Sequence, residues 1–473
     1  MYKVVIGLEV HCEIDTCSKN FSQAKNGYSD IPNSNLDTVD LGFPGVLPVL
    51  NFKAFRKSLM MAMALKCETP DIVLFDRKNY YYPDLPKGYQ ITQITKPVGI
   101  NGEIIVNVDG IDKKVLIHDI HLEEDTASLD HFGDYSLIDY NRSGIPLLET
   151  VTEPCLHSAN EAISFLEALR SVFLYCGVSE ARSDRGQMRC DVNVSLMKDT
   201  DTELGTKVEM KNINSFNNVK LVIEYEITRQ TKILESGGTV LQETRRFSDE
   251  DMCTYSMRSK VDAVDYKYFI EPNIPPIKIT DEWLAEIKKE IPLLQHDRII
   301  KYMDLYELSR YDATILVKEK KVADYFETTI KLGASPKAVS NWLTSTILGH
   351  LNKYDISIDK IYLTPEMLVD LISMVTTGKI SSKQSKEVLY KVLSSEKSPK
   401  EVVEKLDMKQ IGDDDTIRKL VVTILDNNLN LIADHRKGKN VFDYFVGQVM
   451  KQTRGQANPS VTAKIILEEI EKR

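Results

Sequence analysis

The chain of 473 residues carries 60 Lys and Arg against 70 Asp and Glu, and 42% of it is hydrophobic. These figures exclude a disordered, collagen-like or low-complexity protein and predict about two to four domains. The sequence contains no apolar run of about 18 residues, which excludes a transmembrane helix. The formal charge of -10 argues against a broad surface that coats nucleic acid, although a local basic patch remains compatible with it.

The cysteines and the start of the chain bear on its location. The seven cysteines include no CxxC pair, so neither a zinc site nor a disulfide framework is indicated. The first residues are typical of a strand and lack the long apolar region of a signal peptide. We therefore expect a cytoplasmic protein without a membrane partner.

Residues 1–292 are expected to form a β-rich domain, because short β-branched segments alternate with turn signals. Hairpin turns are predicted at Asn101-Gly102, Asp109-Gly110 and Gly237-Gly238. Two helices are predicted over residues 52–65 and 159–175, and Ser158 is a suitable N-cap for the second.

The proline-rich segment 271–276 is typical of a domain boundary. Beyond it the pattern predicts helices, with a helical domain over 293–400 and a small helical tail domain over 401–473. The expected fold class is therefore α+β, with an antiparallel β-rich domain, an all-helical domain and a small helical C-terminal tail.

Several predicted strands gather ionisable residues on one face, because side chains alternate with a period of two. The residues concerned are Glu9 and His11 in 7–14, Glu124 in 117–125, Glu149 in 138–149, Arg189 and Asp191 in 189–196, and Glu209 and Lys211 in 207–212. For a single strand, a solvent-exposed face explains such residues. Several converging faces would instead need charge compensation.

Converging carboxylates point to a cation. Two carboxylates ~4 Å apart repel by about 4 kcal/mol at an effective dielectric of about 20, so they need a cation or bound protons. One imidazole with oxygen ligands and no thiolate favours Mg²⁺ or Mn²⁺ over structural zinc. His11 is equally compatible with an ordinary sheet histidine, so both interpretations stay open.

Basic residues form further candidate contacts. Lys78 and Lys87 flank a tyrosine-rich stretch, where packing of the rings is the commoner role and contact with a phosphate or carboxylate is the alternative. Arg245 and Arg246 would point to opposite faces of an extended segment, so at most one faces a given site. In residues 436–454, basic side chains outnumber acidic ones and can contact phosphates, or can form a solvated helix end.

Together these segments resemble GatB, the B component of the Asp/Glu-tRNA amidotransferase family called GatCAB. The resemblance covers essentially the whole chain in order. Its most specific part is Asn141-Arg142-Ser143-Gly144-Ile145-Pro146-Leu147-Leu148-Glu149. The other matching segments lie at residues 7–11, 77–80, 121–125, 189–193, 209–216, 243–247 and 454–459.

The resemblance implies a cradle-like β-rich domain, a helical domain, a small tail and a two-stage reaction. ATP first phosphorylates the side-chain carboxylate of Glu on tRNA(Gln) or of Asp on tRNA(Asn), and ammonia then displaces the phosphate. A glutaminase (amidase) partner, GatA, would supply the ammonia from glutamine, and a small partner, GatC, would complete a heterotrimer. Which of the two tRNA substrates is used stays open.

Site residues follow from the same resemblance. It places Mg²⁺ (or Mn²⁺) on His11, Glu124 and Glu149. Attack on the activated carboxylate needs neutral ammonia, so we expect a nearby carboxylate, Asp191, to accept a proton from ammonium. The expected catalytic residues are Glu9, Lys78, Lys87, Asp191, Glu209 and Lys211. Arg189 and Arg245 are expected to bind ATP phosphates, and Lys437, Lys439, Lys451 and Arg454 to bind tRNA.

Two rival functions are a non-catalytic tRNA-binding scaffold of the same complex and an unrelated metal-dependent ligase that joins an amine to a small carboxylate.

Overall fold

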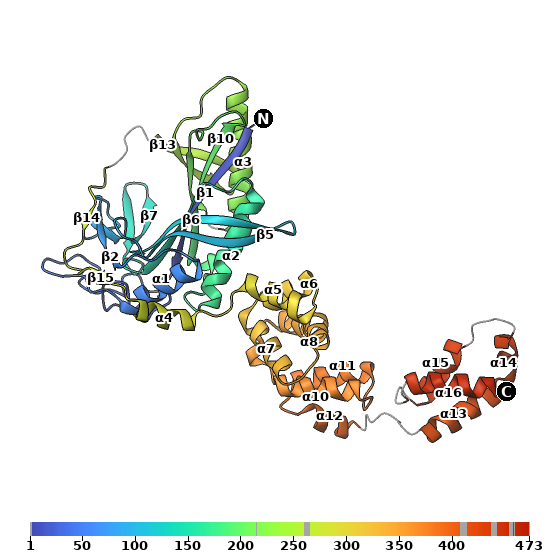
Figure 1. Cartoon of the computed structure of the whole chain (residues 1–473). Coiled ribbons are helices and arrows are strands. Elements are labelled where there is room, and N and C mark those ends of the chain that lie inside the picture. Colours follow the sequence, from blue (N-terminus) through green and yellow to red (C-terminus); the bar gives the residue numbers. More distant parts are fainter. Residues whose placement is uncertain are drawn as a thin grey trace. The chain divides into compact units, whose positions relative to one another are not determined.

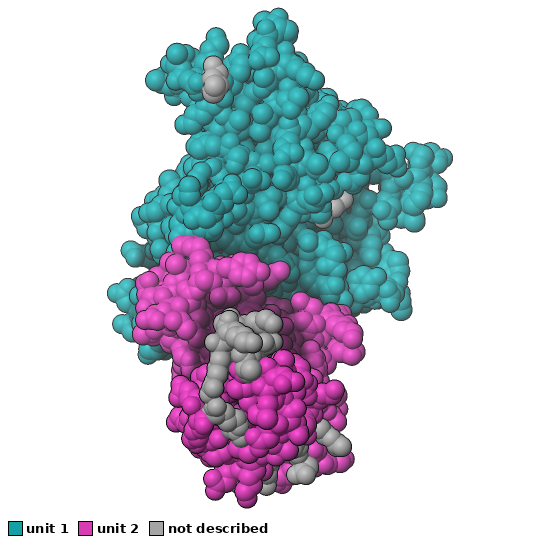
Figure 2. Space-filling model, turned by 90° about the vertical axis from the view of Figure 1, so that its right-hand side faces the viewer, with its two compact units in different colours: residues 1–297 teal, residues 298–473 magenta. Residues whose placement is uncertain are grey.

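The computed structural model describes residues 2–213, 215–259, 265–406, 414–436, 442–453, 457 and 459–472. The chain divides into two compact units, residues 1–297 and residues 298–473 (Figure 2). Within the described residues, every helix is too short or too polar to cross a membrane.

A large sheet organises the described part of the first unit (Figure 1). Its strand order is β13-β12-β11-β10-β1-β9-β6-β5, and neighbouring strands are antiparallel except for the parallel pair β11 and β12. The strands are β1 (Tyr2–Glu13), β5 (Gly99–Val108), β6 (Ile111–Glu124), β9 (Pro146–Thr152), β10 (Met188–Lys198), β11 (Val208–Ile213), β12 (Glu243–Ser248) and β13 (Cys253–Ser259). The mixed α+β class, with a β-rich N-terminal part, is confirmed.

Smaller sheets flank the large one. They join β14 (Phe269–Ile270), β3 (Asp76–Asn79) and β4 (Tyr89–Thr92); β15 (Ile277–Lys278) and β2 (Ile72–Val73); and β7 (Ser128–Phe132) and β8 (Tyr135–Asp139).

Helices cover one face of the large sheet. The helices α1 (Phe52–Ala64), α2 (Ala159–Tyr175) and α3 (Phe216–Glu235) pack on strands of this sheet. Their apolar side chains share one hydrophobic core with alternate residues of β1, such as Leu8 and Val10. Because strand side chains alternate, the residues between these core positions point to the opposite face, away from the helices.

The three predicted hairpin turns had different outcomes. Asp109 and Gly110 have φ angles of 51° and 86° and connect β5 to β6, so that prediction is confirmed. Asn101 and Gly102 lie within β5, and Gly237 and Gly238 follow the end of α3, so those two predictions were wrong. A glycine can also mark close backbone packing or a helix end, and these two pairs serve those purposes.

Close packing at Gly99 predicts a stability effect. A Cβ at Gly99 would lie 2.7 Å from the Cβ of Cys67 and 2.9 Å from the Cβ of Ala62. We expect Gly99→Ala to lower the free energy of unfolding by about 1–3 kcal/mol, because the neighbouring atoms must move. Calorimetric unfolding checks this, with Gly349→Ala as the control. Gly349 lies in a helix and has open space around its Cβ position, so its replacement should stabilise slightly.

The second unit is helical in its described residues. Helix α4 (Asp281–Glu290) still belongs to the first unit, and α5 (Gln295–Tyr306) runs across the division at residue 297. The α-helices after it are α6 (Arg310–Val317), α7 (Lys320–Lys331), α8 (Pro336–Trp342), α9 (Leu348–Tyr354), α10 (Pro365–Thr376), α11 (Ser382–Leu393), α12 (Pro399–Lys405), α13 (Asp414–Asp426), α14 (Leu429–Arg436), α15 (Phe442–Gln452) and α16 (Pro459–Glu471). Two separate hydrophobic clusters lie within residues 302–403 and 417–470. The predicted boundaries at 292 and 400 stay predictions, and α12 runs across the second of these positions.

Candidate active site

Strand register places four ionisable residues in a row on the face opposite the helices. Arg189 pairs with His11 between β10 and β1, His11 pairs with Glu149 between β1 and β9, and Glu149 pairs with His121 between β9 and β6. Residues paired in this way have Cβ atoms about 4.5–5.5 Å apart on the same face. The register therefore brings together residues that are far apart in the sequence.

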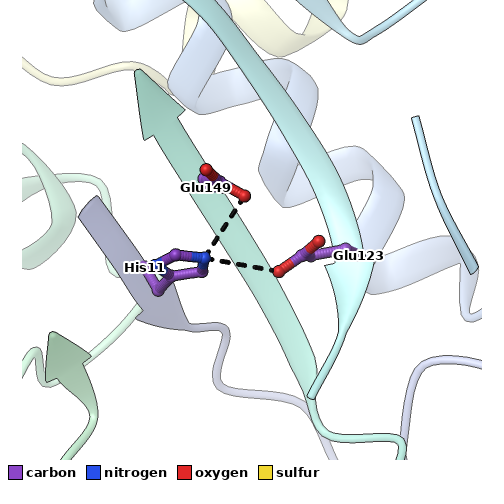
Figure 3. Close-up of side chains that lie close together, drawn as sticks. All are labelled: His11, Glu123 and Glu149. Carbon is purple, nitrogen blue, oxygen red and sulfur yellow. Dashed lines mark ion pairs between the residues drawn. The ribbon is translucent and has the colours of Figure 1, made fainter. Parts of the chain in front are cut away.

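We call His11, His121, Glu123 and Glu149 the His11 cluster. The Nε2 of His11 lies 3.2 Å from Oε2 of Glu149 and 3.5 Å from Oε1 of Glu123. Figure 3 shows these three side chains pointing toward one another from three strands. The Nε2 of His121 lies 3.0 Å from the same Glu149 oxygen, and its Nδ1 lies 2.7 Å from Asp119.

Neighbouring charges shift the pKa values of the residues in the His11 cluster. Burial alone would lower the pKa of His11, but Glu149 and Glu123 outweigh this effect and raise that pKa to about 9. Burial would raise the pKa of Glu149, yet His11 and His121 hold it well below its usual range. Burial and repulsion from Glu149 raise the pKa of Glu123. Each buried carboxylate thus depends on positive charge beside it.

The donor atoms of His11, Glu123 and Glu149 fit a divalent cation. One ligand atom from each lies within 4.8 Å of the other two. An imidazole nitrogen and carboxylate oxygens suit Mg²⁺ or Mn²⁺. A bound cation would also supply the positive charge on which these carboxylates depend.

Glu124, expected as a metal ligand, has other partners. Its carboxylate accepts hydrogen bonds from Lys87 Nζ at 2.7 and 2.6 Å and from the backbone N–H of Ile91 at 2.9 Å. Successive strand residues point to opposite faces, so Glu123 rather than Glu124 accompanies His121. The structure therefore favours Glu123 as the third ligand, while the role of Glu124 stays a prediction.

A cleft of about 600 Å³ opens beside the His11 cluster and is lined in part by Lys78, Gln93, His121, Glu123, Glu149 and Tyr268. The Lys78 ammonium lies 5.0 Å from the centre of the Tyr266 ring. Burial would lower the pKa of Lys78, but the nearby Glu123 raises it. The cleft is thus lined by the Lys78 ammonium together with the carboxylates of Glu123 and Glu149.

A second group of carboxylates, which we call the Glu9 cluster, comprises Glu9, Asp191 and Glu209. One oxygen of each lies within 4.8 Å of the other two. The ammonium of Lys211 lies 2.8 Å from Asp191 and 3.3 Å from Glu209. Glu9 and His11 are two residues apart on β1, so their side chains point to the same face. Both clusters therefore lie on one face of the sheet.

The two arginines expected to bind phosphate differ in their surroundings. Arg189, beside His11 in the register, donates to Asp125 at 2.8 Å and keeps 32% of its side chain exposed. Arg245 is 11% exposed and is paired with Glu243 at 2.7 Å and with Glu226 at 3.3 Å. Among the described residues, Arg245 contacts Glu226, Glu243 and Thr254, which lie outside the His11 cluster.

The tail residues expected to bind tRNA are only partly described. Lys451 lies near the end of α15 and is exposed. Lys437, Lys439 and Arg454 lie outside the described residues. Their role stays a prediction.

Comparison with known proteins identifies the family. Residues 4–285 match the model of the GatB/GatE catalytic domain, and residues 324–470 match the model of the GatB domain. Over 474 residues and the whole of both chains, the protein is 46% identical to the B subunit of the aspartyl/glutamyl-tRNA(Asn/Gln) amidotransferase of Halalkalibacterium halodurans. The corresponding protein of Geobacillus thermodenitrificans is 45% identical over the same length, and that of Persephonella marina is 44% identical over 469 residues, or 99% of each chain.

The chain belongs to the GatB family.

Within this GatB-family chain, sequence reasoning missed two members of the His11 cluster, His121 and Glu123. The sequence did contain a signal for them, because His121 and Glu123 are two residues apart on the strand that also contains Glu124 and therefore share a face. The same spacing of two links Glu9 with His11 and Arg189 with Asp191. This spacing places Glu123, and not Glu124, on the same face as His121.

Proposed function

We propose that this chain is the component of a tRNA-dependent amidotransferase that activates and amidates the side-chain carboxylate of Glu-tRNA(Gln), Asp-tRNA(Asn) or both. The product is Gln-tRNA(Gln) or Asn-tRNA(Asn), and the enzyme is a carbon–nitrogen ligase with glutamine as the amide donor. Family membership supports this activity. The supporting observation in the structure is that the His11 cluster and the Glu9 cluster share strand β1 and lie on the same face of the large sheet.

The first step activates a poor electrophile. An oxygen of the substrate carboxylate forms a bond to the γ-phosphorus of ATP while the bond to the ADP oxygen breaks. Such a transfer depends mainly on positioning and charge neutralisation. His11, Glu123 and Glu149 would hold Mg²⁺ or Mn²⁺, which would supply positive charge to neutralise the charge that develops during the transfer. Lys78 in the cleft and Arg189 beside His11 orient the anionic groups.

The remaining basic residues fit this step unequally. Lys87 stays a predicted catalytic residue, with its ammonium held by Glu124. We leave Arg245 out of the site, because Glu226 and Glu243 hold its guanidinium.

The second step forms the amide. Ammonium gives one proton to Asp191, and the nitrogen lone pair of ammonia then forms a bond to the acyl carbon. The bond from that carbon to the phosphate oxygen breaks, and phosphate leaves with the electron pair and a second proton from nitrogen. Glu9 and Glu209 surround Asp191, and Lys211 orients its carboxylate through the 2.8 Å contact.

Partner proteins complete the reaction. The relatives are named as B subunits of an amidotransferase, so we propose a heterotrimer with the amidase GatA and the small protein GatC. The amidase would release ammonia from glutamine. In the tail, Lys451 together with Lys437, Lys439 and Arg454 would contact tRNA phosphates, which position the substrate.

A reconstituted complex tests the function directly. Given ATP, Mg²⁺, glutamine and Glu-tRNA(Gln) or Asp-tRNA(Asn), it should form the matching amidated tRNA, and the two arms show which substrate is used. Filter binding should retain mischarged tRNA selectively. Equal retention of unrelated RNA together with amidation of a small free carboxylate would support the rival ligase instead.

Metal binding predicts a change in thermal stability. A ligand at 100 times its Kd stabilises the folded state by about 2.7 kcal/mol, so Mn²⁺ should raise the melting temperature of the chain. His11→Ala should remove this increase, because it deletes a ligand atom. Differential scanning calorimetry with and without Mn²⁺ measures the effect. Glu224→Gln, an exposed carboxylate on α3, is the control and should keep it. If Mn²⁺ raised the melting temperature equally in the wild type, His11→Ala and Glu224→Gln, the proposed metal centre would be contradicted.

A further inference from the structure

The hairpin formed by β7 and β8 is separate from the large sheet. Among the described strands these two pair only with each other, in a register that runs from Ser128 opposite Asp139 to Phe132 opposite Tyr135. Within the same part of the chain, each strand packs substantially only on the other. An isolated two-stranded hairpin is at best marginally stable in water, so this one is expected to need a further packing surface.

One face of the hairpin exposes aromatic and aliphatic side chains. Phe132 is 48% exposed, and Tyr135 and Leu137 are each 58% exposed. Phe132 is the register partner of Tyr135, and Leu137 is two residues further on, so the three share one face while His131 points to the other. The Phe132 and Tyr135 rings stack with their centroids 5.5 Å apart. Exposed apolar patches mark interaction sites, and aromatic residues are enriched in protein–protein interfaces.

The charge of the hairpin favours a protein over tRNA as its partner. Residues 128–139 include Asp130, Asp134 and Asp139 and contain no Lys or Arg. Surfaces that bind nucleic acid neutralise phosphates with Lys and Arg, which this segment does not offer. Its carboxylates instead complement a protein surface that has basic side chains around an apolar centre.

The hairpin is joined to both sides of the candidate active site. It follows β6, which contains Glu123, and it precedes β9, which contains Glu149. Arg142 holds the junction, because its guanidinium donates to the backbone carbonyls of Thr126 at 2.9 Å and Ala127 at 3.1 Å. A protein bound to the hairpin would therefore lie beside the strands that carry the expected metal ligands, where amidation needs ammonia.

We propose that the exposed face formed by Phe132, Tyr135 and Leu137 is the docking surface for the amidase partner that supplies ammonia. The matching amidase surface is apolar, with Lys or Arg at its edge. This inference rests on the proposed function, in which the chain is one subunit of a heterotrimer, and the relatives are named as B subunits. Docking here would bring the source of ammonia to the sheet that carries both ionisable clusters.

A binding assay with the purified amidase tests this surface. Replacing both rings, Phe132→Ser with Tyr135→Ser, should raise the Kd of the full chain for the amidase at least about tenfold, because aromatic anchors carry much of the binding energy at interfaces. Surface plasmon resonance measures the Kd, and circular dichroism checks the fold. The control is Ile111→Ser, an exposed apolar residue at the start of β6, which should leave the Kd within about twofold.

Amidation with two nitrogen sources separates docking from chemistry. At amidase concentrations near the wild-type Kd, the double variant should lose most of its glutamine-dependent amidation, because less of it is bound to the amidase. With saturating amidase and ammonium chloride in place of glutamine, it should amidate within about twofold of the wild type, because the His11 and Glu9 clusters are unchanged.

Other occupants of this face predict different results. An unchanged Kd in the folded double variant overturns the docking surface. A loss of mischarged-tRNA retention on filters with an unchanged amidase Kd would also overturn it and would assign the face to RNA. A wild-type dimer that the double variant abolishes, again with an unchanged amidase Kd, would assign the face to a second copy of the chain. Failure of the wild-type complex to amidate tRNA with either nitrogen source would instead refute the proposed function.

Discussion

Replacing His11 with alanine is expected to lower Glu-tRNA-dependent ATP hydrolysis at least about 100-fold in the assembled complex, the scale of losing one preorganised electrostatic group. The imidazole lies 3.2 Å from Glu149 and 3.5 Å from Glu123, so its loss removes a ligand and leaves two buried carboxylates less compensated. Release of phosphate from labelled ATP, with and without mischarged tRNA, measures the effect.

His131→Ala is the matched control for this variant. His131 is exposed on β7 and contacts Ser136, so its replacement should leave ATP hydrolysis within about twofold. Glutamine hydrolysis by the amidase partner reports whether the variant complex has assembled. Full ATP turnover in an assembled His11→Ala complex would favour the scaffold rival, in which this chain only binds tRNA.

Replacing Asp191 with asparagine is expected to separate the two chemical steps. The variant should keep Glu-tRNA-dependent ATP hydrolysis but lose amide formation about 100-fold or more, because general acid–base groups contribute about 10²–10⁴-fold. Asparagine keeps the size of the side chain but cannot accept a proton from ammonium. Thin-layer analysis of the aminoacyl product after tRNA digestion measures amide formation directly.

The control for Asp191→Asn is Asp184→Asn. Asp184 is exposed and pairs with Arg182 at 2.6 Å, so both steps should stay near wild-type rates. If Asp191→Asn lowered phosphorylation and amidation equally, Asp191 would not be specific to the amidation step. Unchanged amide formation would remove it from the mechanism.

Local signals predicted much of the fold. The helix at 159–175 has the bounds of α2, and Ser158 caps it by accepting from the N–H of Glu161 at 3.1 Å. The alternation of Leu8 and Val10 with Glu9 and His11 correctly separated buried from polar positions on β1. These features depend on residues that are close in the sequence, so period and capping are enough to reveal them.

The candidate site was only partly predictable. His11 and Glu149 were singled out and do lie together, as do Glu9, Asp191 and Glu209. Glu123 was passed over in favour of its neighbour, and Arg245 lies in an ion-pair network with α3.

The amino-acid pattern alone established that several strands would each carry charges on a single face, and it revealed the family resemblance. It did not establish that β1 would lie between β9 and β10, or that His11 would stand opposite Glu149 on one side and Arg189 on the other. Alternation assigns each side chain to a face, but strand order and register come from packing the whole sheet against α1, α2 and α3. The partners of each charge therefore emerged only from the folded chain.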